Sequence, residues 1–248
     1  MEQYSNSFYI FLVFTILFML LVNNFSFKNG SPTCDNYVIN NYLYLALSIS
    51  ILGLSVNGVN WNSLVKSPLL IFIISLVLVI LLTLQRTFQE SMNEVYFSHL
   101  YWFLFIISIS IVMYIFLRSL PTYKYINSTI MIVAVIFVVM SSFVYLNPSF
   151  FEKTYNFMTL ALLIALISII VIELSVMFFA SKETILSTYR YTSYVVILIF
   201  SLFISYDTTR MFEYAKKCIN YPNYPKTSTS FFLDIVNLFM RILSLRSR

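Results

Sequence analysis

The sequence predicts an all-α protein, a polytopic bundle of transmembrane helices, and three observations lead to this fold class. Hydrophobic residues make up 60% of the 248 residues, and only 10% are charged. A soluble domain carries about 25% charged residues, so this chain could not cover a surface exposed to water. The mean hydropathy is +0.85, and apolar runs of membrane length recur along the whole chain.

Each predicted helix follows from an apolar run close to the ~20 residues that cross a bilayer. Seven such runs predict full spans, at 8–27, 40–59, 68–84, 97–117, 126–146, 155–180 and 190–206. The first run lacks a preceding basic residue and a cleavage site, which favours an uncleaved span. An eighth run, 229–243, is shorter and predicts either a re-entrant helix or an eighth span.

The connections between these runs are short, and we interpret residues 1–248 as a single membrane domain. The longest connection is the polar stretch 207–228, where Pro222 and Pro225 are expected to break any helix. Cys34 and Cys218 fall in connections on the same side of the membrane, and we expect them to be free thiols.

The distribution of basic residues leaves the orientation open. If the first seven runs cross, the N-terminal side holds Lys66, Arg118, Lys124, Lys182 and Arg190, and the opposite side holds Lys28, Arg86, Lys153, Arg210, Lys216, Lys217 and Lys226. Arg241, Arg246 and Arg248 are added to one of these sides by the last segment. If that segment crosses, the N-terminal side holds eight basic residues and the opposite side seven. If it turns back, the numbers are five and ten. Cytosolic loops carry the excess of basic residues, so the rule indicates a cytosolic C-terminus only for a re-entrant segment.

Two carboxylates lie in or beside the last apolar runs. Asp207 closes the run that ends at 206, and Asp234 interrupts the run 230–243. An ionised group at the bilayer centre costs roughly 3 kcal/mol or more, so such a residue indicates a function. On a helix, Asp234 shares one face with Ser230, Asn237 and Arg241. Alternatively, Asp207 caps a helix end in the headgroup layer and Asp234 pairs with an arginine.

The sequence around these carboxylates resembles a known family. Tyr206-Asp207-Thr208, followed by Phe232-Leu233-Asp234-Ile235-Val236-Asn237-Leu238-Phe239 and Ile242-Leu243, is similar to the C-terminal signature of the Bax inhibitor family, the transmembrane Bax-inhibitor-motif proteins. In that family a Tyr-Asp-Thr ends the penultimate helix and a Leu-Asp-Ile-Ile-Asn-Leu-Phe-type run forms the last one. The resemblance covers residues 201–245.

The resemblance implies a pH-sensitive calcium leak channel or a modulator of cell death. Two carboxylates held close together in a low-dielectric site share a proton, and the doubly ionised pair attracts a hard cation. Calcium takes six to eight oxygen ligands, which Asp207, Asp234, Asn237 and Thr208 would supply only loosely, with carbonyls and water. We therefore expect calcium as a weakly and transiently bound permeant ion, with no resident cofactor. The alternative is a non-conducting structural membrane protein, for example of a viral inner membrane or capsid shell.

Members of the family also tend to carry an acidic residue in a middle helix and a basic residue that latches one aspartate. Glu173, inside the run 155–180, is either that acid or a carboxyl that bonds to Ser or Tyr neighbours. Arg86 is either the latch or, with Glu90 and Glu94 at i, i+4 and i+8, part of a solvated helix extension with ion pairs.

Other classes of function have little support. The chain has one His and two Cys, which is unlike a zinc site, and it has neither a phosphate-binding loop nor a nucleophile elbow, so we expect no enzyme. The net charge of +5 is too scattered for a nucleic-acid site.

Expected partners are the lipid bilayer and either another membrane protein or a second copy of the chain. We expect an intracellular membrane of endoplasmic reticulum or Golgi type, or a virion membrane. Abundant Ile, Asn, Tyr, Phe and Lys favours a low-GC source such as a large DNA virus or a protist.

Overall fold

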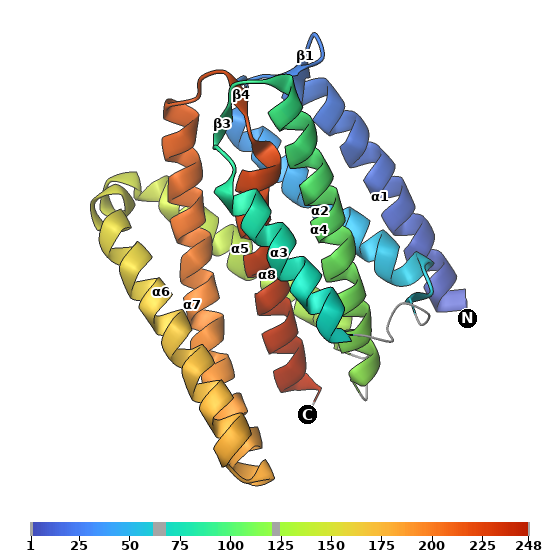
Figure 1. Cartoon of the computed structure of the whole chain (residues 1–248), viewed down its shortest axis with the longest axis vertical. Coiled ribbons are helices and arrows are strands. Elements are labelled where there is room, and N and C mark those ends of the chain that lie inside the picture. The colour runs from blue at the N-terminus through green and yellow to red at the C-terminus, as the bar shows by residue number, and fades with distance from the viewer. Residues whose placement is uncertain (1, 62–67, 121–124, 248) are drawn as a thin grey trace. The chain divides into compact units, whose positions relative to one another are not determined.

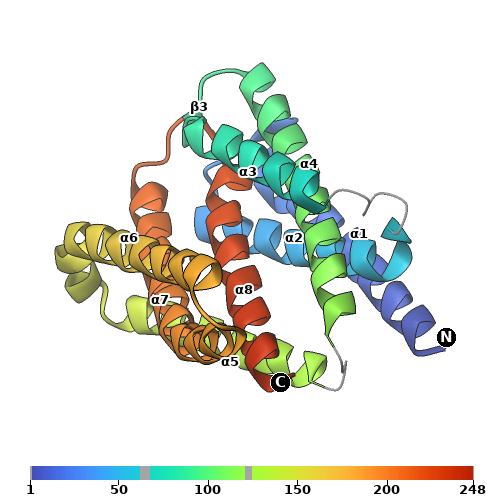
Figure 2. The same cartoon turned by 60° about the horizontal axis from the view of Figure 1, so that its bottom comes forward.

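The computed structural model describes residues 2–61, 68–120 and 125–247, and that part of the chain contains eight α-helices (Figures 1 and 2). They are α1 (Glu2–Ser26), α2 (Tyr37–Gly58), α3 (Pro68–Leu84), α4 (Met92–Ser119), α5 (Ile126–Leu146), α6 (Pro148–Phe179), α7 (Lys182–Lys216) and α8 (Tyr224–Arg246). Lys66 and Lys124 of the predicted charge distribution lie outside the described residues. The all-α prediction is confirmed.

Four two-residue strands lie in the loops as two antiparallel pairs. Strand β1 (Phe27–Lys28) pairs with β2 (Ser31–Pro32), with Phe27 opposite Pro32. Strand β3 (Phe88–Gln89) pairs with β4 (Tyr221–Pro222), with Phe88 opposite Pro222. The second pair joins the α3–α4 loop to the α7–α8 loop.

Within the described residues, seven helices are long and apolar enough to cross a membrane, as predicted, but the short helix is a different one. Helix α3 has 17 residues, about 26 Å at a rise of about 1.5 Å per residue, slightly less than the ~30 Å hydrocarbon core. Helix α8 is an uninterrupted helix of 23 residues. Of the two forms predicted for the last segment, its length therefore supports an eighth span and not a short helix.

Helix α8 begins earlier than its apolar run because of how its first turn is capped. The Asn223 side-chain Oδ1 accepts a hydrogen bond from the backbone N–H of Lys226 at 3.0 Å, which satisfies one of the free donors of the first turn. Pro225 is also in that turn, where its missing N–H leaves no helix bond unmade. The proline that was expected to break the helix therefore lies inside it.

Helix α7 likewise continues past its apolar run, to Lys216. The hydroxyls of Thr208 and Thr209 donate to the carbonyls of Ile204 and Ser205, four residues earlier, at 2.7 and 2.9 Å. These bonds satisfy the polar side chains within the helix. The predicted linker 207–228 is thus mostly helix, and Asp207 lies in the interior of α7 instead of at its end.

The chain divides into two compact units. The first comprises residues 1–119 and 214–232, and the second comprises 120–213 and 233–248. In the first unit α2 packs against α1 and α4, and α3 packs against α4. Gly53 and Gly58 of α2 leave room for the rings of Phe11 and Phe8 of α1, because a Cβ at either glycine would overlap the ring.

The second unit contains α5, α6, most of α7 and the C-terminal part of α8. Its apolar core is formed by Val133 of α5, Leu162 and Ile169 of α6, Val196, Ile199, Phe200 and Ile204 of α7, and Leu238 and Ile242 of α8. All four helices thus contribute to one core, and the predicted site residues of α7 and α8 adjoin it.

Candidate acid-pair site

The two predicted aspartates lie at matching depths on consecutive helices. Asp207 is nine residues before the end of α7, and Asp234 is ten residues after the start of α8. At a rise of about 1.5 Å per residue, both are about 14–15 Å along their helices from the α7–α8 turn. Their side chains are near enough for their charges to interact. We call these two residues the acid pair.

Both members of the acid pair are buried. Asp207 is 6% exposed and Asp234 is 5% exposed. In the described part of the chain, Oδ2 of Asp234 has no hydrogen-bond partner. A buried polar atom without a partner carries the full cost of its lost hydration, so this oxygen is available to a proton, a cation or water.

One basic residue adjoins the pair on the Asp207 side. Arg210 follows Asp207 by one helical turn on α7, is half-buried, and interacts electrostatically with the Asp207 carboxylate. An opposite charge at this position stabilises the ionised form of a carboxylate. The two members of the pair thus have different electrostatic surroundings.

The predicted supporting residues have mainly local bonds. Asn237 is half-buried and donates from Nδ2 to the carbonyl of Leu233 at 2.8 Å. Thr208 is fully buried, and its hydroxyl lies 3.3 Å from the Ser141 hydroxyl of α5 in addition to its bond to Ile204. Thr208 therefore links α7 to α5 beside Asp207.

An apolar layer lies one turn from the acid pair on each helix. Ile204 of α7 and Leu238 of α8 are both 0% exposed and belong to the core of the second unit. Phe231 is also fully buried, whereas Leu233 and Ile235 are only half-buried. The acid pair therefore lies at the edge of an apolar core, since Ile204 and Leu238 are its neighbours one turn away on that side.

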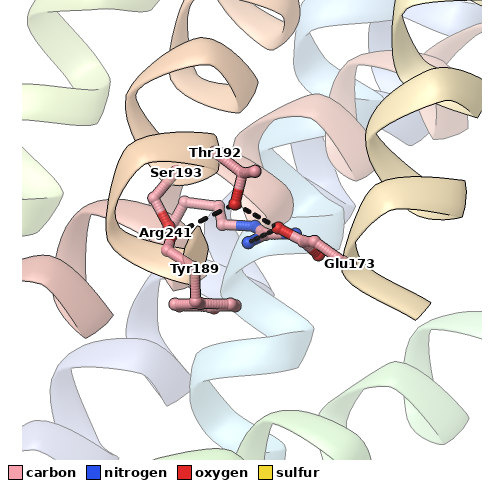
Figure 3. A network of polar contacts seen from close by, with 5 residues as sticks. All are labelled: Glu173, Tyr189, Thr192, Ser193 and Arg241. Carbon is pink, nitrogen blue, oxygen red and sulfur yellow. Dashed lines mark hydrogen bonds and ion pairs between the residues drawn. The ribbon is translucent and has the colours of Figure 1, made fainter. Parts of the chain in front are cut away.

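Glu173 of α6 forms a second polar site in the same unit (Figure 3). Arg241 Nη1 and Nη2 donate to Glu173 Oε1 and Oε2 at 2.7 and 2.8 Å. The Thr192 hydroxyl of α7 donates to Oε1 at 2.6 Å. The Arg241 guanidinium also lies over the Tyr189 ring, 4.6 Å from its centroid. We call Glu173, Arg241, Thr192 and Tyr189 the ion-pair network.

The ion-pair network joins three helices through one carboxylate. The side chains of Arg241 and Glu173 are 19% and 22% exposed, and the two parallel bonds are the strong fork geometry of arginine with carboxylate. Of the two interpretations of Glu173, bonding to Ser or Tyr neighbours does not hold, because Arg241 and Thr192 occupy its oxygens, and its role as the middle-helix acid stays a prediction. Arg241, predicted on the polar face of Asp234, bonds to Glu173.

Arg86 lies in the α3–α4 loop and forms an ion pair with Glu90, and both side chains are largely exposed. The backbone N–H of Glu90 donates to Glu94 Oε2 at 3.1 Å. The predicted ion pairing is thus present, but residues 85–91 form a loop with strand β3 and not a helix extension. The reason is the β3–β4 pairing, which holds this segment extended.

The predicted free thiols are also a wrong expectation. Cys34 and Cys218 form a disulfide, with their Cα atoms 5.8 Å apart. Within the described residues, no three His, Cys, Asp or Glu side chains are grouped as a metal site.

Comparison with protein families agrees with this geometry. The family model described as "Inhibitor of apoptosis-promoting Bax1" matches residues 34–247, which is most of the chain. The chain belongs to the Bax inhibitor family. The match extends the resemblance from residues 201–245 to nearly the whole sequence, and with the seven apolar helices it identifies a multi-pass integral membrane protein. A search of curated proteins found no match.

Sequence reasoning about this Bax inhibitor family member missed the ion-pair network as a unit. A signal for it was present, because Glu173 and Arg241 are both charged residues within apolar runs. Charges inside a membrane segment pair with one another, so an unmatched acid and an unmatched base predict a bond between their helices. Arg210 was counted only as a loop charge, since α7 was expected to end before it.

Proposed function

We propose that this Bax inhibitor family member is a pH-sensitive calcium leak channel that modulates cell death in an intracellular membrane of endoplasmic reticulum or Golgi type. The observation that supports the proposal is the acid pair, two buried carboxylates at matching depths of α7 and α8 whose charges interact. Membership of the family supports the same function.

The acid pair can respond to protons because two carboxylates in a low-dielectric site cannot both ionise cheaply. With one proton shared, the pair carries one negative charge and forms a stable closed contact. With the proton lost, the two charges repel each other and attract a hard cation. Titration then belongs to the pair and not to either residue alone.

Calcium is the substrate of this proposal and not a resident ion. It takes six to eight oxygen ligands, and two aspartates provide at most four. The remaining ligands would come from water and from neighbours such as Thr208, whose hydroxyl is already bonded within α7. Binding is therefore loose, which allows an ion to leave as well as to enter.

A non-conducting structural membrane protein is the second candidate, and the apolar layer favours it. Ile204 and Leu238 are fully buried directly beside the acid pair, so conduction requires this layer to part. For either candidate we propose a role without catalysis, in contact with the bilayer and with a membrane-protein partner or a second copy of the chain.

A calcium-dye assay in liposomes tests the proposal. Wild-type protein should leak calcium at a rate that changes between about pH 6 and 8, as the shared proton is lost. Asp234→Asn should abolish this pH dependence because an amide does not titrate, and Asp207→Asn should shift it. Asp35→Asn is a matched control, since Asp35 is a loop carboxylate with its side chain 69% exposed, and it should leave the profile unchanged.

Two results would separate the candidates. A folded, correctly inserted wild-type protein that passes no calcium at any pH would refute conduction and favour the structural role. A leak that is identical in wild type and Asp234→Asn would show that the acid pair does not control it.

A further inference from the structure

The α7–α8 turn is held by three kinds of contact, all within the first unit. Strand β4 pairs with β3. The side chain of Asn223, which is 0% exposed, accepts from the Ser98 hydroxyl at 2.5 Å and donates to Gln85 Oε1 and the Arg86 carbonyl at 3.2 and 3.1 Å. The third contact is the Cys34–Cys218 disulfide. Only the last of these is covalent, so it can be opened by chemistry.

The start of α8 has contacts that do not depend on the disulfide. The Tyr224 hydroxyl donates to the Thr33 carbonyl at 2.5 Å and accepts from Asn40 Nδ2 at 3.1 Å. The Tyr37 hydroxyl lies 3.3 Å from the Thr227 hydroxyl. These buried contacts attach α8 to the segment before α2 and to α2 itself, whether or not the sulfurs are joined.

The end of α7 lies directly before the disulfide in the chain. Cys218 follows the last helical residue, Lys216, by two positions, and the residues on both sides of Cys218 are exposed. The Tyr214 ring packs against Phe88 at a centroid distance of 6.0 Å. Opening the disulfide therefore leaves non-covalent contacts alone at the end of α7, while α8 keeps its buried attachment.

We propose that the Cys34–Cys218 disulfide is a redox-sensitive clamp on the end of α7, located on the side of the membrane that faces an oxidising compartment. Disulfides persist in such compartments and are rare in the cytosol. The disulfide joins residues 27–36 and 217–223 on one side of the membrane. Helices α2 to α7 lie between these two segments, so the shorter helix α3 must cross together with the other five. The start of α1 and the end of α8 then face the opposite, cytosolic side.

This placement resolves the orientation that the charges left open. If α1 to α8 all cross, the basic residues of the sequence divide eight against seven, which gives almost no preference. The disulfide supplies the missing constraint, since it requires the α1–α2 and α7–α8 connections to be outside the cytosol.

The clamp opens by thiol–disulfide exchange with a dithiol. One thiolate of the dithiol attacks a sulfur of the Cys34–Cys218 bond and forms a mixed disulfide, and the second thiolate displaces the protein sulfur. Two electrons and two protons pass to the chain, which gains two thiols, and the dithiol becomes a disulfide. Both cysteines are half-buried, and the chain contains two cysteines in all, so no other pairing within one chain competes.

The redox state in the cell is tested by trapping. Membranes containing the full chain are blocked with N-ethylmaleimide, denatured, and labelled with a polyethylene-glycol maleimide before or after dithiothreitol. No label before reduction and two labels after it are the expected result. Two thiols already blocked in the unreduced sample would overturn the proposed compartment.

The clamp itself is tested by hydrogen–deuterium exchange of the purified protein in lipid nanodiscs, with and without dithiothreitol. Reduction should remove protection from residues 211–220 and leave residues 224–230 protected. The matched control is the double variant Cys34→Ser/Cys218→Ser. Its exchange should resemble that of the reduced wild type and should be the same with and without dithiothreitol. If the variant fails to fold, the wild-type comparison decides alone.

Unchanged exchange on reduction, or equal loss of protection at 211–220 and 224–230, would overturn the clamp. Any effect of the clamp on calcium rests on the proposed function, because Asp207 lies nine residues before the end of α7. Hydrogen–deuterium exchange is the measurement because it does not depend on calcium conduction. A leak assay that shows no calcium flux would count against conduction and would not bear on the clamp.

Discussion

Removing the arginine of the ion-pair network should destabilise the protein strongly. In Arg241→Met the stem is retained, but Glu173 loses both guanidinium bonds, at 2.7 and 2.8 Å. Breaking a buried pair by removing one partner costs about 3–5 kcal/mol. Because the two side chains remain 19% and 22% exposed, we expect the lower end, about 3 kcal/mol. For a chain of this length that is a fall in Tm of about 6–12 °C.

Thermal unfolding in detergent micelles measures this change, and two further variants make it specific. The double variant Glu173→Leu/Arg241→Met should regain most of the loss, because replacing both members of a buried pair by apolar residues is often neutral. Arg190→Met is the matched control, since Arg190 is an exposed arginine of α7, and its effect should be within about 0.5 kcal/mol. Two results would refute the reasoning. One is a Tm for Arg241→Met equal to that of Arg190→Met. The other is a fall in Tm of the double variant that exceeds the sum of the falls for Glu173→Leu and Arg241→Met.

Two more substitutions test the packing of the first unit by the same unfolding measurement. Gly53→Val should lower the free energy of unfolding by about 1–3 kcal/mol, because the valine side chain would occupy the place of the Phe11 ring. Gly30→Ala is the control, since no atom lies near the new Cβ and only the positive φ of that turn is tested. Equal losses of stability in the two variants would contradict the packing argument. Asn223→Ala should cost about 1–3 kcal/mol, because it leaves the buried Ser98 hydroxyl without its acceptor and α8 without its cap. Asn24→Ala, at an exposed position of α1, should not produce a loss of that size.

The number and order of the helices could be predicted from the sequence, but their ends could not. Apolar runs mark the part of a helix that lies in hydrocarbon, and the hydrogen-bonded helix continues beyond it wherever side chains satisfy the backbone. Thr208 and Thr209 bond to their own helix and let α7 pass Asp207. Asn223 caps α8 so that Pro225 falls in a harmless first-turn position. Both features depend on the direction of a hydroxyl or amide side chain, and a hydropathy profile gives no information about that direction.

The acid pair and the family were identified from the same short motif, whereas bonds between distant segments were not. The distance from Glu173 to Arg241 along the chain is 68 residues, and from Cys34 to Cys218 it is 184. Pattern and spacing describe one helix face at a time, so they predicted Arg241 beside Asp234 on α8 without showing that α6 would bring a carboxylate to it. The disulfide required knowing that two loops on one side of the membrane meet.

The acid pair and the ion-pair network of the second unit are connected, because Arg241 bonds to Glu173 and not to Asp234. Asp234 and Arg241 lie seven residues apart on the same face of α8, so an unpaired Arg241 would be the nearest cation along the helix to Asp234. Glu173 accepts both guanidinium bonds, and Tyr189 covers the guanidinium face. The charge of Arg241 is thereby compensated within the ion-pair network. Asp234 is left beside Asp207 with one oxygen unbonded among the described residues, as the proposed shared proton requires.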